Sequence, residues 1–208
     1  MFQFRKKLNY KILVPPLSKP IEQLTREEAE AFFAWYMSKI EDRITYLQEY
    51  SGLNLDYSSD SLYALWKWFL KIAVVERTPS KLLCDQLQKM EHFLANTSNA
   101  YIAKTKNRLS KQLSVESQYI IRDIGMYLGQ VFVKNHPTTS WACYMRRDVC
   151  CNKPVVLGFV SRDGVKPSYP PFEPIWMVQI QAYKIINGGA SADGLLKLYN
   201  NWLKYIED

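Results

Sequence analysis

Residues 114–145 read SVESQYIIRDIGMYLGQVFVKNHPTTSWACYM, and this stretch contains the change of periodicity that decides the fold class. Up to Phe132 its apolar residues recur at three- and four-residue steps, which is typical of one face of a helix. From Thr138 onward apolar and polar side chains alternate, with Trp141 among the first, and this alternation indicates a strand. A long helix followed directly by a strand predicts an α+β fold.

Two glycines, Gly125 and Gly129, lie one turn apart in the predicted helix. Each costs about 1 kcal/mol relative to alanine in a helix interior. We therefore expect another backbone segment or a large aromatic ring to approach this face of the helix closely.

Further helices are predicted on both sides of this stretch. The clearest begins at a capping box formed by Thr25 and Glu28 and ends at Gly52. The other helical patterns begin at Ser58 or Ser59, at Pro79, at Pro174 and at Ser191. The helix that begins at Ser58 or Ser59 is expected to end before Pro79, and the helix that begins at Pro79 is expected to extend to Leu94. Residues 101–113 have too thin an apolar pattern to be assigned.

The strand that contains Trp141 is expected to pair with a second strand over residues 154–159, as a small antiparallel hairpin near residues 139–160. No repeat or linker divides the 208 residues, so we predict one predominantly helical α+β domain, residues 1–208, with about six helices. Its parts in chain order are an extended N-terminal arm (1–20), a helical part (21–137), the hairpin (138–160) and a C-terminal helix pair (172–208).

The composition points to an ordinary globular protein of the cytoplasm. Apolar residues make up 48% of the chain and charged residues 23%, which excludes a disordered or low-complexity protein. No apolar run follows the basic residues near the N-terminus, so we expect neither a signal peptide nor a membrane span. The cysteines, which lack the spacing of a disulfide framework, are Cys84, Cys143, Cys150 and Cys151.

The sequence offers little for catalysis, because it contains only two histidines, His92 and His136. A Cys84–His92 pair on one helix is conceivable as a nucleophile with its base. A metal site would need His136 together with the three later cysteines, whose spacing does not match that of zinc ligands. Ordinary thiols and a surface imidazole are the simpler interpretation, so we predict no metal and no cofactor, and we favour a protein without enzymatic activity.

Charge is segregated along the chain. The first predicted helix region, residues 22–50, carries seven acids and three cations, although the whole chain has a net charge of +7. We expect its acids to steer a basic partner protein. The residues predicted to bind that partner are Glu27, Glu28 and Glu30 on the helix and Trp141, Tyr144, Arg146 and Arg147 on the hairpin.

A basic segment without any acid suggests an alternative function. Lys104, Lys106, Arg108 and Lys111 lie close together in the sequence. Nucleic-acid-binding proteins combine such cations with aromatic side chains on which bases stack. The alternative is therefore a nucleic-acid-binding protein that uses this segment and the hairpin.

Three tryptophans, Trp35, Trp68 and Trp176, fall off the main apolar stripe of their predicted helices. Each either widens the buried face of its helix or contributes to an exposed partner surface, where tryptophan is enriched. Exposure of two of them together would favour a partner surface.

Residues 123–132, followed by Trp141 and by residues 154–158, resemble uncharacterised small cytoplasmic bacterial proteins that have a glycine-containing helix before a tryptophan-bearing hairpin. The resemblance extends to the helix starts at Thr25 and Asp60, and it implies a non-catalytic, partner-binding role such as that of toxin-immunity proteins. Gln130 stands where similar sequences place Glu, which argues against a catalytic use of that position. We therefore expect a protein–protein interaction module of immunity or accessory type, whose oligomeric state is left open.

Overall fold

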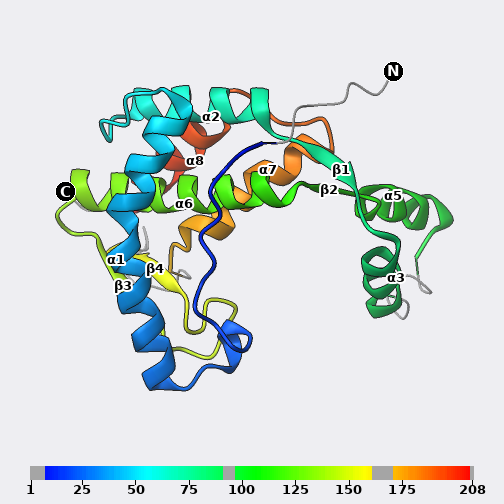
Figure 1. The fold of residues 1–208 in the computed structure, drawn as a ribbon, viewed down its shortest axis with the longest axis horizontal. Helices are drawn as coiled ribbons and strands as arrows, with labels where there is room; N and C mark the ends of the chain where they lie inside the picture. The colour runs from blue at the N-terminus through cyan, green and yellow to red at the C-terminus, as the bar shows by residue number, and fades with distance from the viewer. Residues whose placement is uncertain (1–7, 91–96, 161–170, 207–208) are drawn as a thin grey trace.

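A computed structural model of the chain describes residues 8–90, 97–160 and 171–206. In that part the chain forms seven α-helices and two small antiparallel sheets, which confirms the predominantly helical α+β class (Figure 1). Five helices make up what we call the body: α1 (Arg26–Ser51), α2 (Ser59–Ile72), α6 (Val115–Asn135), α7 (Pro174–Ile186) and α8 (Gly194–Leu203). None of the described helices is long and apolar enough to cross a membrane.

The central helix of the body is α6, which packs against both α1 and α7, while α2 packs against α8 (Figure 1). The glycines of α6 allow this close packing. A Cβ atom added at Gly125 would lie 2.7 Å from the Cα atom of Ile175, and one added at Gly129 would overlap the ring of Trp141. The expected close approach is thus confirmed for both glycines, by a backbone in one case and an aromatic ring in the other.

Helix α1 begins and ends where the sequence predicts. The Thr25 side chain accepts a hydrogen bond from the backbone N–H of Glu28, the Glu28 carboxylate accepts one from the Thr25 N–H, and Gly52 ends the helix with a φ angle of 68°. A 3-10 helix, η1 (Ile21–Gln23), precedes it. The inner face of α1 contributes Tyr36 and Ile40 to the hydrophobic core of the body.

The predicted hairpin is present as β3 (Ser140–Cys143) and β4 (Pro154–Leu157), with Trp141 opposite Val156. Phe172 forms an isolated bridge to Val156 on the other side of β4. This bridge brings the start of α7 beside the hairpin.

A second sheet, which the sequence analysis missed, carries a projecting unit that we call the lobe. Its elements are β1 (Val75–Arg77), α3 (Ser80–Lys89), α5 (Asn99–Leu109) and β2 (Lys111–Leu113). The β1–β2 ribbon leads away from the body to the two helices (Figure 1). At its root, the Ser114 N–H donates to the Val74 carbonyl, and the Val74 N–H donates to Ser117 Oγ.

The structure of this region bears on three expectations. The helix expected from Ser58 ends at Ile72, before Pro79 as predicted, and the chain then turns into β1. The helix expected from Pro79 to Leu94 ends at Lys89 with Met90 as its C-cap, and residues 91–94 lie outside the described part. The unassigned stretch 101–113 is a helix and a strand, with Ser98 as the helix N-cap. Strands of three mostly exposed residues show no periodicity that a sequence would reveal.

Residues 8–20 form an extended arm that runs across the front of the body in Figure 1, as expected of a segment with three prolines. A buried ion pair holds it in place. The Tyr10 hydroxyl donates to the Asp123 carboxylate of α6, which also pairs with Arg43 of α1. The guanidinium of Arg43 donates in addition to the Lys11 carbonyl at 2.9 Å.

Candidate functional site

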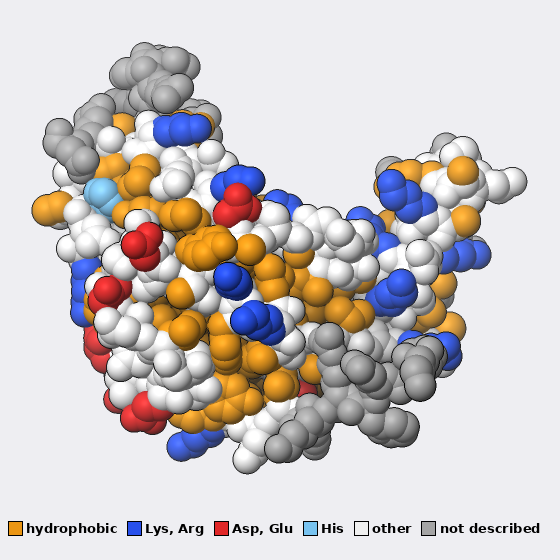
Figure 2. Space-filling model, turned by 90° about the horizontal axis from the view of Figure 1, so that it is seen from above, with side chains coloured by type: hydrophobic (Ala, Val, Ile, Leu, Met, Phe, Trp, Pro, Cys, Tyr) orange, Lys and Arg blue, Asp and Glu red, His pale blue; other side chains and the backbone are white. Residues whose placement is uncertain are grey.

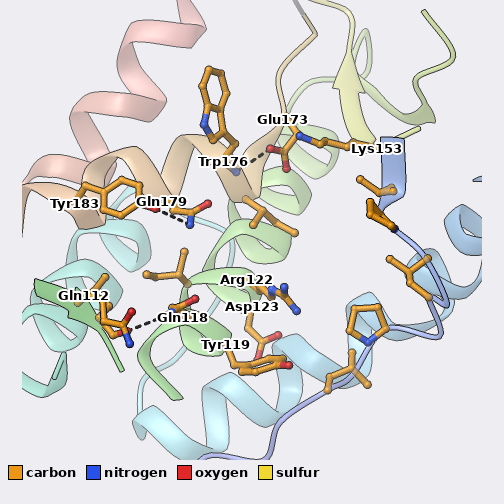
Figure 3. Close-up of a pocket in the computed structure, with 18 of the residues that line it drawn as sticks. Gln112, Gln118, Tyr119, Arg122, Asp123, Lys153, Glu173, Trp176, Gln179 and Tyr183 are labelled. Carbon is orange, nitrogen blue, oxygen red and sulfur yellow. Dashed lines mark hydrogen bonds between the residues drawn. The ribbon is translucent and has the colours of Figure 1, made fainter. Parts of the chain in front are cut away.

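The arm, α6, α7 and the lobe enclose a groove of about 880 Å³, which we call the arm groove (Figure 3). Helices α6 and α7 contribute side chains such as Tyr119, Arg122, Trp176 and Gln179, which surround the cavity in the close-up. The volume lies in the upper part of the range found for ligand pockets. The groove is therefore the first candidate for a binding site.

Apolar side chains of the arm and of α1 line much of the groove. The arm alternates, so that Leu13, Pro15 and Leu17 line it while the residues between them are exposed. On α1, Trp35 stacks on Phe32 with ring centroids 5.6 Å apart. These surfaces favour a ligand with apolar parts.

Three buried polar atoms of the groove have no hydrogen-bond partner. Within the part of the chain that the structure describes, the buried side-chain atoms without a partner are Tyr36 Oη, Thr78 Oγ1 and Gln86 Oε1. All three residues line the arm groove. Because buried polar atoms are nearly always satisfied in folded proteins, their concentration in one cavity makes the arm groove the candidate ligand site of the described part of the chain.

Glu173 is the titratable group that the groove perturbs most clearly. It is the N-cap of α7 and accepts a hydrogen bond from the Trp176 N–H at 3.0 Å. Burial raises the pKa of its carboxyl group to about 7, although the neighbouring Lys153 acts in the opposite direction. The groove thus contains one carboxyl group that changes charge near neutral pH.

Asp123 also lines the groove, but its carboxylate is already occupied by Arg43 and Tyr10. It is 2% exposed and serves to fix the arm. Burial raises the pKa of the Tyr36 hydroxyl well above its usual value, so that group remains neutral. Tyr36 and Asp123 therefore offer hydrogen bonding and anchoring rather than proton transfer.

The accessible charges of the groove are all positive. Lys19 pairs with Glu28 at 2.7 Å, and Lys153 lies 4.0 Å from Glu22. The remaining cations that line the groove form no ion pair among the described residues, and they are Arg108, Lys111 and Arg122. The two acids that line it, in contrast, are buried.

The predicted acidic residues lie outside the groove, at the N-terminal end of α1. Glu28 completes the capping box, and its hydrogen bonds to Lys19 lower its pKa. Glu30 pairs with Arg26 at 2.9 Å. Glu27 is exposed in the same turn. Their role in partner binding stays a prediction, although two of the three are already paired within the chain.

Trp141 is half-buried and packs within the body. Its ring lies on Gly129 and meets Tyr36 edge-on at 5.6 Å. The indole N–H donates to Gln130 Oε1, and Gln130 Nε2 donates to Glu41 at 3.1 Å. An amide fits this position because it accepts from one neighbour and donates to the other, which a glutamate cannot do.

The other hairpin residues lie around the turn between β3 and β4. The Tyr144 hydroxyl donates to Asp148 at 2.8 Å, while Arg146 and Arg147 are exposed. Arg147 and Arg26 line a second, more open depression there. The structure brings these hairpin residues together with the start of α1, but not with the arm groove.

The basic segment lies on α5 and β2 of the lobe, where Lys104, Lys106, Arg108 and Lys111 are exposed. Figure 1 places the lobe and the β3–β4 hairpin at different ends of the molecule. The two parts of the chain named for nucleic-acid binding therefore lie apart, and their use in binding stays a prediction. Of the four cations, Arg108 and Lys111 reach the arm groove.

The three tryptophans that fall off the apolar stripes of their helices lie in two different environments. Trp68 is half-buried and meets Tyr50 edge-on, so it widens the buried face of its helix. Trp176 is 43% exposed, Trp35 is half-buried, and both line the arm groove. Two of the three thus share one cavity.

No three His, Cys, Asp or Glu side chains of the described residues are grouped so that they would hold a metal ion. His136 contacts the Tyr199 hydroxyl at 3.0 Å. Cys84 is exposed on α3, and its suggested partner His92 lies outside the described residues. All four cysteines are free thiols.

Sequence reasoning missed the groove residues Tyr36, Thr78, Gln86 and Glu173. Glu173 had a usable signal, since an acid before Pro174 is typical of a helix N-cap. The other three carry no local signal, because a missing partner is a property of the assembled cavity. The chain matches no protein-family model, no curated protein and no solved structure.

Proposed function

We propose that the chain is a non-enzymatic protein-interaction module that binds a segment of a partner protein in the arm groove. The single observation that carries this proposal is that all the unpartnered buried polar atoms of the described residues line one largely apolar cavity. A partner segment would bury its apolar side chains there and supply the missing hydrogen bonds.

The chemistry of the groove supports binding rather than catalysis. Glu173 is hydrogen-bonded at a helix start, Asp123 is held by Arg43, and neither carboxyl group is hydrogen-bonded to a serine, threonine or cysteine side chain of the described residues. Trp176 presents an exposed aromatic ring of the kind that dominates binding energy at interfaces.

The immunity or accessory role implied by the resemblance is a specific form of the same proposal, in which the bound segment belongs to a toxin or to another effector protein. A cytoplasmic location also belongs to the proposal, and the four free thiols agree with it.

A photo-crosslinking experiment tests the proposal. A photoreactive phenylalanine analogue replaces Trp176 in the groove or, as a matched control, Tyr63 on α2, which is 37% exposed and does not line the groove. We expect irradiation in the source cells to yield a discrete cross-linked protein from position 176 alone. Trp35→Glu, which adds a charge to the apolar wall, should abolish the product.

Equal products from both positions, or no product from position 176, would contradict the proposal. Circular dichroism and thermal unfolding of each variant show beforehand that the protein is folded, so that a lost product reports on the groove.

The second candidate, a nucleic-acid-binding protein, has one observation in its favour. Arg77 and Lys111 are direct cross-strand partners in the β1–β2 ribbon, and like charges in that position are unfavourable without an anion nearby. Binding of oligonucleotides by the lobe should weaken steeply with salt. Lys104→Glu with Lys106→Glu should weaken it further, and fluorescence anisotropy with single- and double-stranded DNA and RNA decides the question.

A further inference from the structure

We infer that the arm groove binds an extended, acidic segment of the partner, whose carboxylates lie against Lys111 and Arg122 while its apolar side chains enter the cavity. This inference rests on the proposed function, since it names the chemistry of the segment that the groove would take.

The positive charge of the groove indicates the charge of the segment that binds there. Arg108, Lys111 and Arg122 line the groove and are exposed, and none forms an ion pair with a carboxylate within the described part of the chain. Arg122 acts on the buried Asp123 only through its charge and keeps an exposed guanidinium. Arg122 lies over the ring of Tyr119 at 4.8 Å, which holds its guanidinium beside the cavity (Figure 3). A basic segment would meet like charges at each of these positions, whereas Asp and Glu side chains would find partners.

The unpartnered polar atoms of the groove indicate the conformation of the bound segment. They are two hydroxyl groups, of Tyr36 and Thr78, and one amide oxygen, of Gln86, which needs a donor. An extended chain offers N–H and C=O groups along its length, whereas a helix has already used its own except at the ends. The groove is therefore suited to an extended backbone.

The apolar walls of the groove indicate the sequence pattern of the segment. An extended segment directs successive side chains to opposite sides. Alternate apolar residues would face the apolar walls, to which Trp35 and Trp176 contribute, and the acids between them would face the cations that line the groove. The expected sequence pattern of the partner is thus an alternation of apolar residues with Asp or Glu.

Two other occupants fit poorly on charge. The chain's own N-terminal residues include Arg5, Lys6 and Lys7, which have the same sign as the edge of the groove. A second copy of the chain brings a net charge of +7. An acidic segment of a separate protein is the occupant that the charges of the groove favour.

Selection from a phage library of random linear peptides tests the inference on the full-length protein. We expect enriched peptides to combine apolar residues with Asp or Glu. Fluorescein-labelled copies of these peptides, measured by fluorescence anisotropy, should bind the Lys111→Glu/Arg122→Glu variant about tenfold or more weakly than the wild type. The matched control, Lys67→Glu/Lys71→Glu, reverses two exposed charges on α2 outside the groove and should bind as the wild type does.

Tyr36→Phe provides a second variant that separates binding from folding. Its hydroxyl has no partner in the free protein, so its removal should leave the fold intact. It should weaken peptide binding about three- to tenfold, the usual effect of one hydrogen bond.

The outcomes separate the inference from the proposed function. Enriched peptides that lack acids but still depend on Trp176 would overturn the acidic partner and leave the binding module in place. Peptides that become helical when bound, shown by circular dichroism, would overturn the extended conformation. Failure to enrich any peptide that depends on the groove would overturn both proposals.

Discussion

The body and the lobe are both built from amphipathic helices, yet they bury very different amounts of their surfaces. In the body, α6 alone buries twelve residues, including Phe132 and Tyr127. In the lobe, α3 buries none of its described residues and α5 buries only Thr105. The space-filling view shows the lobe standing away from the body, with Lys and Arg side chains gathered on it (Figure 2).

The difference teaches that helix formation and tertiary stability have separate causes in this chain. Helix α5 begins at the Ser98 N-cap, whereas α3 has no side-chain cap. The two helices pack on each other, and α5 also packs on β2, instead of on a core. Most of the stability of a helix comes from burial of its apolar face. We therefore expect the lobe to open locally more readily than the body, and to be the wall of the arm groove that can adapt to a ligand.

Replacement of an aromatic ring in the core of the body should cause the largest loss of stability, against which a replacement in the lobe can be compared. Phe132 is fully buried and contacts Phe172 and Tyr199 at ring distances of 5.0 and 4.8 Å. Phe132→Ala should lower the free energy of unfolding by about 3–5 kcal/mol. The lobe counterpart, Leu82→Ala, removes a 42% exposed side chain and should cost less than about 1 kcal/mol in the same urea titrations. Similar costs at both positions would show that the lobe packs as tightly as the body.

Titration of Glu173 should produce the next largest effect. Its pKa is raised to about 7 in the folded protein by burial, so its contribution to stability is present at pH values below about 4.5 and is lost as the pH rises through about 7. At about pH 8, Glu173→Gln should be more stable than the wild type by on the order of 3 kcal/mol. Near pH 4.5 the two should be equal. Urea titrations across this range test the prediction, and a constant difference would refute it.

A side chain added on the glycine face of α6 should lower the stability of the protein. Gly125→Ala places a Cβ atom 2.7 Å from the Ile175 backbone and should cost about 1–3 kcal/mol. Gly189→Ala is the matched control, because nothing lies within 4 Å of its added Cβ, and it should be neutral or slightly stabilising. Thermal unfolding of both variants measures the difference, and equal melting temperatures would mean that α7 moves aside freely.

The smallest effect is expected in the lobe ribbon. Lys111→Glu replaces a like-charge pair with Arg77 by an opposite-charge pair and should stabilise the lobe by about 0.2–1 kcal/mol. Hydrogen exchange should show slower exchange of α5 amides and no change in α6. Lys104→Glu, which has no cross-strand partner, provides the control. A change that extends into α6 would show that the lobe and the body unfold together.

Local chemistry explains which elements were predictable. The capping box at Thr25, the stop at Gly52 and the alternation through Trp141 each depend on neighbouring residues, and each appears in the structure. The glycine pair of α6 also predicted a close approach, because a helix contains such glycines only for a reason. The ribbon beneath the lobe was not predictable, since β1 and β2 are only three residues long, and neither shows an alternation of buried and exposed positions.

The candidate site was less predictable than the fold. Trp176 and Trp35 were noted as unusual, and Arg108 and Lys111 as basic, but nothing in the sequence places them in one groove. Tyr36 occupies an apolar position of α1, so its hydroxyl gave no sign that it would lack a partner.

The sequence by itself determined the helices of the body, the hairpin and the excess of positive charge, because periodicity, caps and turns act over a few residues. Only the tertiary structure decided where the arm lies, how the lobe projects and which polar atoms lack partners. These features depend on contacts between distant segments, such as Tyr10 with Asp123 across the body and Val74 with Ser117 at the root of the ribbon. Their energies arise from desolvation and pairing after the chain has folded, and no local pattern encodes them.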